Sequence, residues 1–413
     1  MSRLPPALRI RDYGLLWLTT LLTGFGLQMV AVAVGWQVYA IRHSAFDLGL
    51  IGLAEFVPLP LLALPSGQLA DHVSRRLVIL ISCGLDLVTV LLLLVVTLSG
   101  ADKLWPFLVL AAATGVSTAV GAPGLRAIAP LLVPVELLPS AMALRSIAFQ
   151  GATVLGPALG GLLFALDDAS VYVVAALLLV VSIVCAVALR VPPVEEPSEP
   201  LGRDSLLAGI RFIRRTEVLL GAISLDLFAV LFGGAVALLP LFARSILHVG
   251  PFGLGILRAS PALGAIVAGI VLTHRPLKGN AGKTLLFVVA VFGASMIVFG
   301  LSTSFPLSLA ALAVSGFADM YSMNIRGTTV ALATPDALRG RVMAVEMVFI
   351  SASNELGAFE SGLAAALLGA VTSVVAGGAL TIGLAVVWPL LFPALAAIDR
   401  LEELKPLERV PIT

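Results

Sequence analysis

The sequence predicts an all-α membrane protein with twelve transmembrane helices in two pseudo-symmetric six-helix bundles. Composition is the first reason: 59% of the 413 residues are apolar and 12% are charged, whereas a soluble globular protein carries about 25% charged residues. Apolar runs also recur at the length of about 20 residues that a helix needs to cross the hydrocarbon core. A polar, proline-rich stretch divides these runs into two equal sets. A water-soluble fold is therefore excluded, and the function must be carried out within the bilayer.

The individual helices are predicted from apolar runs that end at charged residues, prolines or glycines. The first run begins at Tyr13 and continues to about Tyr39. It is longer than the apolar region of a signal peptide and lacks a small-residue cleavage site, so we expect it to be retained as the first span. The expected spans are 12–40, 46–70, 77–100, 104–130, 139–166, 169–190, 217–245, 251–273, 283–303, 305–332, 340–368 and 371–397.

Basic residues indicate the orientation of these spans. With the N-terminus inside, 18 of the 25 lysines and arginines lie in cytoplasmic segments or at the cytoplasmic ends of spans, and four lie in span interiors. The outer loops and outer span ends hold the remaining three, Arg42, Lys103 and Arg244. Because cytoplasmic loops of membrane proteins carry the excess of positive charge, we expect both termini to be cytoplasmic.

The longest break in hydrophobicity is the stretch 191–205, with four prolines and three glutamates. Such a segment forms neither a packed nor a membrane-embedded element. Directly after it, Leu206, Ile210 and Ile213 recur at helical spacing. They predict either an amphipathic helix on the inner leaflet or a frayed start to the seventh span. The expected parts are an N-terminal bundle 1–190, a linker with the amphipathic helix 191–216, a C-terminal bundle 217–397 and a cytoplasmic tail 398–413.

The two halves show a weak internal repeat. A shift of 200 residues places Arg126 on Arg326 and Leu138 on Leu338. Many secondary transporters are built from such repeats and bind their substrate near the bilayer midplane between the halves. The same organisation is therefore expected here.

The loop between the second and third spans reads GQLADHVSRR at 67–76. Asp71 can accept hydrogen bonds from backbone N–H groups at a helix start, and the arginines hold the loop at the inner surface. Gly67, Asp71, Arg75 and Arg76 match a signature of the major facilitator superfamily, which this loop resembles. The resemblance implies a gate that differs between inward-open and outward-open states. The alternative is an anchor of positive charge alone.

The fifth span carries GPALGG at 156–161. Small residues let helices approach closely, and a proline within a membrane helix makes a point that can bend or unwind. Gly156, Pro157, Gly160 and Gly161 resemble the end of a motif in the fifth span of superfamily exporters, which implies outward, antiport-type transport. A generic helix-packing patch is the alternative.

Three further segments sharpen the resemblance: RDYGLLWLT near the start, SLLAGIRFIRR after the linker and TPDALRGRVMA at 334–344. Together they resemble the branch of the superfamily that includes enterobactin exporters and macrolide efflux proteins. The similarity extends over essentially the whole chain. It implies a bacterial cytoplasmic-membrane location and a monomer, and it leaves the transported compound open because that branch handles unrelated substrates.

Charged residues within spans are the candidates for coupling and substrate contact, since each is costly in hydrocarbon and normally faces a cavity or a partner. In the superfamily, spans one, four, seven and ten line the central cavity. That resemblance favours Asp226 and Asp319. Glu360 and Glu55 are further carboxylates that could carry a proton, and Arg126, Arg326 and Arg258 are candidate cavity cations.

Asp226 is the leading candidate for proton coupling. It lies about nine residues, or roughly 13 Å, into the seventh span. Burial favours the neutral form of a carboxyl group and a nearby arginine favours the charged form, so alternation between the two environments couples a proton to a conformational change. The alternative is a carboxylate that is permanently paired with an arginine for packing. Asp319 and Arg326 are seven residues apart on one helical face, too far for a direct bridge but close enough to share a cavity.

Several other functions are excluded by the sequence. A net charge of +1 does not suit a nucleic-acid binder. The two cysteines, Cys83 and Cys185, and the four histidines show no metal-ligand spacing, so neither a metal site nor a cofactor is expected. No hydrolase motif occurs, so the chain is not expected to be an enzyme. The expected partners are a small-molecule substrate, protons and the lipid bilayer.

Taken together, these features predict a secondary transporter that exports an amphipathic or hydrophobic small molecule, a drug or a siderophore, in exchange for protons. Two alternatives stay open. One is an importer or facilitator of the same fold. The other is a membrane protein that does not transport and serves as a sensor or a lipid-handling factor.

Overall fold

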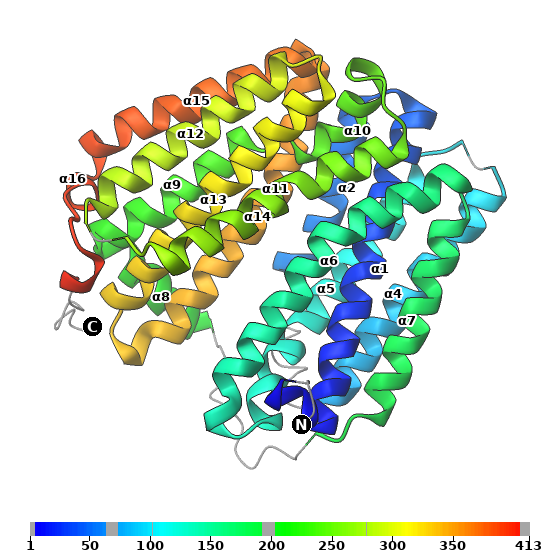
Figure 1. Ribbon diagram of the computed structural model, residues 1–413, viewed down its shortest axis with the longest axis horizontal. Coiled ribbons are helices and arrows are strands. Elements are labelled where there is room, and N and C mark those ends of the chain that lie inside the picture. The colour runs from blue at the N-terminus through cyan, green and yellow to red at the C-terminus, as the bar shows by residue number, and fades with distance from the viewer. Residues whose placement is uncertain (1–4, 63–72, 101, 192–202, 278, 405–413) are drawn as a thin grey trace. The chain divides into compact units, whose positions relative to one another are not determined.

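The structure is a computed structural model that describes residues 5–62, 73–100, 102–191, 203–277 and 279–404, and its described part is helical almost throughout (Figure 1). Its long helices are α1 (Arg11–Arg42), α2 (Ala45–Phe56), α4 (Arg75–Leu98), α5 (Trp105–Leu132), α6 (Leu138–Leu166), α7 (Ser170–Ala188), α8 (Arg203–Arg215), α9 (Glu217–Gly233), α11 (Pro251–His274), α12 (Ala281–Leu301), α13 (Phe305–Ala333), α14 (Asp336–Leu368) and α15 (Ala370–Leu391). Short elements are η1 (Pro6–Arg9), η2 (Val135–Leu137), η3 (Val236–Leu238), α10 (Leu239–Leu241), η4 (Phe242–Ile246), α16 (Pro393–Ala396) and η5 (Leu401–Glu403).

Ten helical segments of the described chain are long and apolar enough to cross a membrane, and Trp105–Gly121 is a shorter apolar helix. The helix α13 covers the expected tenth span, although it is less apolar because it carries Asp319 and Arg326 in its interior. A helix is thus found at each of the twelve expected positions. The all-α membrane architecture predicted from the apolar runs is confirmed.

The chain divides into two compact units. The N-terminal unit comprises 1–200 together with 248–259, and the C-terminal unit comprises 201–247 together with 260–413. The start of α11 therefore belongs with the N-terminal unit, although it lies beyond the linker in sequence.

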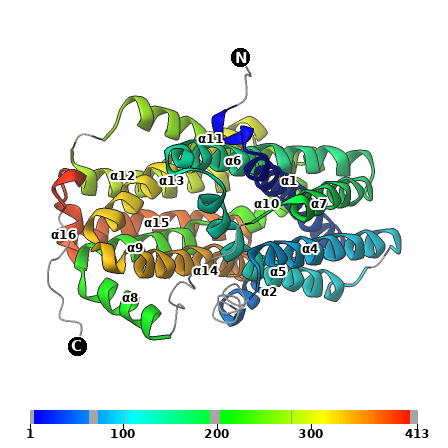
Figure 2. The ribbon, with the colours of Figure 1, turned by 90° about the horizontal axis from the view of Figure 1, so that it is seen from below.

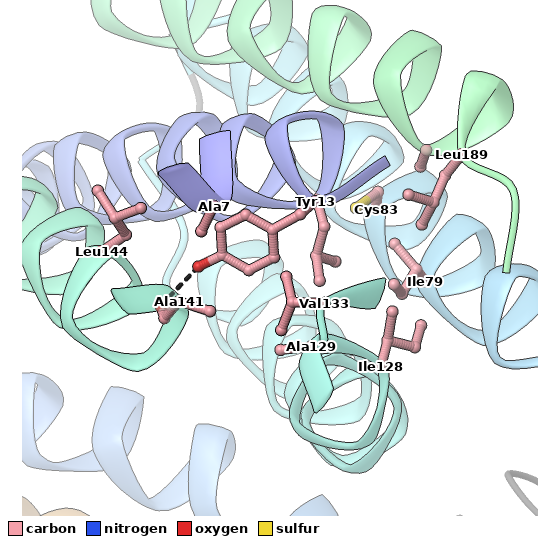
Figure 3. Close-up of a cluster of buried hydrophobic side chains, with 12 residues drawn as sticks. Ala7, Tyr13, Ile79, Cys83, Ile128, Ala129, Val133, Ala141, Leu144 and Leu189 are labelled. Carbon is pink, nitrogen blue, oxygen red and sulfur yellow. Dashed lines mark hydrogen bonds between the residues drawn. The ribbon is translucent and has the colours of Figure 1, made fainter. Parts of the chain in front are cut away.

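The segment RDYGLLWLT packs in a hydrophobic cluster of the N-terminal unit. Tyr13 on α1 is buried, and its hydroxyl donates to the carbonyl of Ala141 on α6 at 2.6 Å. Its ring packs within a cluster that includes Ile79, Ile128 and Leu189 (Figure 3). One turn later, the Trp17 indole donates to the carbonyl of Leu144 at 2.8 Å. The two aromatic side chains thus join the start of α1 to α6 through both apolar burial and hydrogen bonds.

In the C-terminal unit, α8 is a helix of its own rather than a frayed start of the seventh span. It ends at Arg215, and Thr216 is extended before α9 begins at Glu217. The helix packs beside α14 and α9 (Figure 2). Phe212 and Ile213 are its buried face. The amphipathic interpretation is therefore the one that the helix boundaries support.

The expected seventh span is interrupted in its C-terminal half. The helix α9 ends at Gly233, and Gly234 is extended before the short elements η3, α10 and η4 complete the segment. The hydroxyl of Ser361 on α14 donates to the carbonyl of Gly234 at 2.6 Å. A neighbouring helix thus satisfies a backbone group that the break releases, as membrane proteins require.

Candidate functional site

The centre of the C-terminal unit holds a buried ion pair between two of the charged residues that the sequence selects. The Oδ2 atom of Asp226 on α9 lies 2.7 Å from Nη1 of Arg326 on α13. The side chains are 9% and 6% exposed, so water screens the pair little. The Nε atom of Arg326 also donates to the hydroxyl of Ser322 at 3.1 Å, one turn earlier on the same helix. Arg326 is thereby held by two partners in a fixed direction.

Asp319 lies beside this pair in a different setting. Its side chain is exposed, whereas Asp226 is 7% exposed. Both residues line one small cavity together with Ser322 and Phe292. The space open to the centre of a water molecule there is about 10 Å³, close to the room that a single water requires. The cavity therefore places a paired carboxylate and an accessible one around a space of one water molecule.

The chemistry that this site can perform follows from the charges of Asp226, Arg326 and Asp319. A buried ion pair is stable only while both charges are present, because loss of one leaves the other uncompensated in a medium of low dielectric constant. Protonation of Asp226 would release Arg326, and Asp319, which lines the same cavity, is a nearby acidic group through which a proton could arrive. Uptake of a proton by Asp226 can thus break its ion pair with Arg326.

The remaining predicted charges are not part of this cluster. Glu360 lies on α14, partly exposed, and does not line the cavity. Glu55 lies on α2 in the N-terminal unit, where its carbonyl packs closely against Gly115 of α5. Arg258 also belongs to the N-terminal unit, and its Nη1 atom lies 3.5 Å from the carbonyl of Ala31. Arg126 is within α5, and its side chain lies outside the described residues.

Of the loop motif at 67–76, the structure describes only residues 73–76. Gly67 and Asp71 lie outside the described residues. Ser74, which stands where the superfamily signature has a second glycine, has a φ of −56° and accepts a hydrogen bond from the Leu77 amide as the cap of α4. No positive φ is needed there, so serine replaces glycine without strain. Arg76 donates to the carbonyls of Ala186 and Val187, and so binds the C-terminal end of α7.

The glycines of GPALGG are positions of close backbone contact. A Cβ atom at Gly160 would lie 2.6 Å from Cα of Met29, and one at Gly156 would lie 2.7 Å from Cβ of Gln28, both on α1. A Cβ atom at Gly161 would lie 2.3 Å from the carbonyl oxygen of Pro251 at the start of α11. Any larger residue would force helices apart. The motif packs α6 against two neighbours at once, and α6 runs through Pro157 without interruption.

Two polar features of the structure are not indicated by the sequence pattern. One is Ser322, whose only signal is its position one turn before Arg326. The other is a buried network in the N-terminal unit, in which the Tyr172 hydroxyl donates to Gln37 at 2.5 Å and the Gln37 amide donates to Thr97 at 3.0 Å. These residues come from three helices and are uncharged, so no composition or spacing pattern connects them.

Apolar spanning helices in two units, with charged side chains gathered inside one of them, define a multi-pass membrane transporter. The chain belongs to the major facilitator superfamily, because the model of the family described as transmembrane secretion effector matches residues 2–411. It is thus a secondary transporter rather than an enzyme, and a multi-pass protein of the bacterial inner membrane.

Individual relatives agree with this family. The enterobactin exporter EntS of Shigella boydii serotype 18 is 28% identical over 389 residues, which are 92% of this chain and 91% of the relative. The enterobactin exporter EntS of Escherichia coli O157:H7 strain EC4115 shows the same identity and coverage.

Solved structures agree in fold. A bacterial homologue of the lysosomal transporter Spinster, inward-facing and unoccupied, has a TM-score of 0.71 at 16% identity, over 96% of this chain and 97% of that one. A bacterial homologue of the iron transporter ferroportin has a TM-score of 0.69 at 16% identity, over 95% and 100% of the two chains. These likenesses show the major facilitator fold.

Proposed function

We propose that this protein exports an amphipathic or hydrophobic small molecule of the siderophore or drug class in exchange for protons. The observation that carries the proposal is the buried Asp226–Arg326 pair beside the exposed Asp319. The similarity to enterobactin exporters over most of the chain supports the siderophore class and the outward direction. Close packing at GPALGG is compatible with the exporter motif that these residues resemble.

In the proposed mechanism, Asp226 is the proton carrier and Asp319 is its relay. Protonation of Asp226 releases Arg326, and the change in pairing biases the C-terminal bundle toward one of two states. Substrate binding between the bundles favours the deprotonated, paired state, so one proton enters as one substrate leaves. Differential stabilisation of two states is the requirement for such coupling. Glu360 and Glu55 remain secondary carboxylates in this proposal, and Arg126 and Arg258 are cavity cations.

The same proposal assigns roles to the remaining segments. The bundles 1–190 and 217–397 rock about the central site, and the linker 191–216 joins them on the cytoplasmic side, where the tail 398–413 also lies. The loop 67–76 latches the inner gate. Orientation with both termini cytoplasmic rests on the excess of basic residues in those segments, and the protein acts as a monomer.

The coupling is tested in proteoliposomes loaded with enterobactin. Wild-type protein should move enterobactin against its gradient when a pH gradient is imposed, and Asp226→Asn should abolish this while keeping exchange of labelled for unlabelled enterobactin without a pH gradient. The exchange assay shows that the variant is folded and binds substrate. Full pH-driven transport by Asp226→Asn would refute the assignment.

The direction and class of substrate are tested in a deletion strain. Loss of the protein should raise intracellular enterobactin or dye, and the wild-type gene should restore the normal level. A lowered level in the deletion strain would indicate an importer of the same fold. Unchanged accumulation of every siderophore, dye and antibiotic would favour the non-transporting alternative.

A further inference from the structure

A cavity lies between α8, α9 and α14 of the C-terminal unit, away from the ion pair. The space open to the centre of a water molecule there is about 110 Å³. Its wall is formed by one face of each helix, with Ile210, Ile213 and Arg214 from α8, Leu220, Ile223 and Ser224 from α9, and Val345 and Phe349 from α14.

The surface that faces this cavity is apolar. Ser224 is the sole hydroxyl among the lining residues, and it donates to the carbonyl of Leu220 within α9. An ordered water needs two to four polar partners, so this space does not hold ordered water. Two of the three helices that line the cavity, α9 and α14, belong to segments that are long and apolar enough to span the membrane. The medium expected to fill the cavity is therefore hydrocarbon.

The cavity is part of a firmly packed region. Gly209 on α8 approaches α14 so closely that a Cβ atom there would lie 3.0 Å from the Arg341 carbonyl oxygen. Phe212 is 3% exposed and Val342 is fully buried within the cluster that joins α8, α9, α13 and α14. The helix α8 is therefore fixed against its neighbours, and the cavity is a built feature of the unit.

Charge marks one end of the cavity. Arg214 lines it, and Arg211 lies one turn away on the same exposed side of α8. Both arginines precede Glu217, where the membrane-spanning segment begins. Ile223 lies six residues beyond Glu217, or about 9 Å deeper along α9. The lining is thus cationic at the membrane boundary and apolar within the hydrocarbon layer.

We infer that this cavity binds an anionic phospholipid, with one acyl chain in the apolar space and the phosphate at Arg211 and Arg214. Guanidinium groups bind phosphate through paired N–H···O hydrogen bonds, and basic residues beside a span attract anionic lipids. Among the ion pairs of the described chain, none engages either arginine. The inference is independent of the transported substrate and of proton coupling.

The test measures lipid binding to the full-length protein in detergent by native mass spectrometry. Dioleoylphosphatidylglycerol and dioleoylphosphatidylcholine have the same acyl chains, so a difference between them reports the headgroup. Wild-type protein should retain phosphatidylglycerol at least ten-fold more tightly. The variant Arg211→Gln/Arg214→Gln should weaken phosphatidylglycerol binding about 30-fold, at the strength expected for two arginines near a membrane surface.

Two further variants separate headgroup, acyl chain and overall charge. Ile210→Trp fills the cavity from a position that is 37% exposed, and should weaken binding of both lipids. The matched control Arg275→Gln/Arg400→Gln removes two exposed arginines elsewhere and should leave binding unchanged. Unaltered binding in Arg211→Gln/Arg214→Gln or in Ile210→Trp, an equal loss in the control, or equal retention of the two lipids by wild type would each overturn the inference.

Discussion

Asp226 in the C-terminal unit and Asp86 in the N-terminal unit are both buried, and the two residues have different surroundings. Asp226 in the C-terminal unit is 7% exposed and paired with Arg326. Asp86 in the N-terminal unit is 3% exposed, its Oδ1 atom has no hydrogen-bond partner, and it takes part in no ion pair of the described chain. Burial of a carboxyl group thus occurs in both units, but of these two aspartates only Asp226 is paired with a cation. The buried Asp47 at the start of α2 also has a cationic partner, but that partner, Arg42, is exposed. The comparison teaches that a buried charge alone does not mark the proposed coupling site, whereas a buried carboxylate with a buried cationic partner does.

Two helix pairs, one in each unit, also differ in how they are joined. In the N-terminal unit, α1 and α6 meet through the glycines of GPALGG and through neutral hydrogen bonds such as that of Tyr13. In the C-terminal unit, α9 and α13 meet through the ion pair. Close glycine packing depends little on pH, whereas an ion pair requires one protonation state. The proposed switch therefore belongs to the contact between α9 and α13, whereas the contact between α1 and α6 is expected to depend little on pH.

The largest effect is expected from Arg326→Gln. It leaves Asp226 uncompensated, and removal of one partner from a buried pair costs about 3–5 kcal/mol of stability. The double variant Asp226→Asn/Arg326→Gln should recover part of that loss because neither charge remains. Thermal unfolding of the purified protein measures both. Equal stability of Arg326→Gln and wild type would show that the pair is not a stabilising contact.

The next largest effect is expected from Gly160→Val. The new side chain would meet the α1 backbone at Met29, and overpacking of a close contact costs about 1–3 kcal/mol. Gly151→Ala is the matched control, because nothing lies within 4 Å of a Cβ atom at that position of the same helix. The melting temperature in detergent should fall for Gly160→Val alone. A similar fall in both variants would indicate that helix α6 is sensitive to any substitution.

Tyr172→Phe should have an intermediate effect. The change removes the hydroxyl that donates to Gln37 in a site where Tyr172 is fully buried, and an unsatisfied buried polar group costs about 1–3 kcal/mol. Gln37→Leu in the same background should restore part of the stability, since it removes the unsatisfied acceptor. Unfolding of the two variants by heat provides the comparison, and additive losses would contradict a shared network.

The smallest effect is expected from Asp86→Asn. The asparagine has almost the same shape, and no cation of a described ion pair loses a partner, so the change in stability should not exceed about 1 kcal/mol, the net contribution of a single hydrogen bond. Asp226→Asn, by contrast, strands Arg326. The comparison of the two melting temperatures tests the difference between the buried aspartates directly. A loss of equal size at Asp86 would reveal a cationic partner there.

The order and type of the elements follow from the sequence alone. Apolar runs such as 77–100 and 169–190 lie at α4 and α7 because a hydrocarbon solvent admits only segments that satisfy their own backbone hydrogen bonds. Asp226, Asp319 and Arg326 are recognisable for the same reason, since each stands out against the apolar composition of its span. The amphipathic spacing of Ile210 and Ile213 likewise predicts α8.

Tertiary structure alone decides which of these residues meet. The sequence places Asp319 and Arg326 on one helical face, too far apart for a direct bridge, but it does not show that the guanidinium bonds to Asp226 on another helix and to Ser322. The break after Gly233 and the cavity under α8 are equally invisible in a pattern of apolar residues. Helix periodicity determines which face of a helix a residue lies on. The partner of that residue depends on which other helix packs against the face, and that packing is decided by residues distant in the chain.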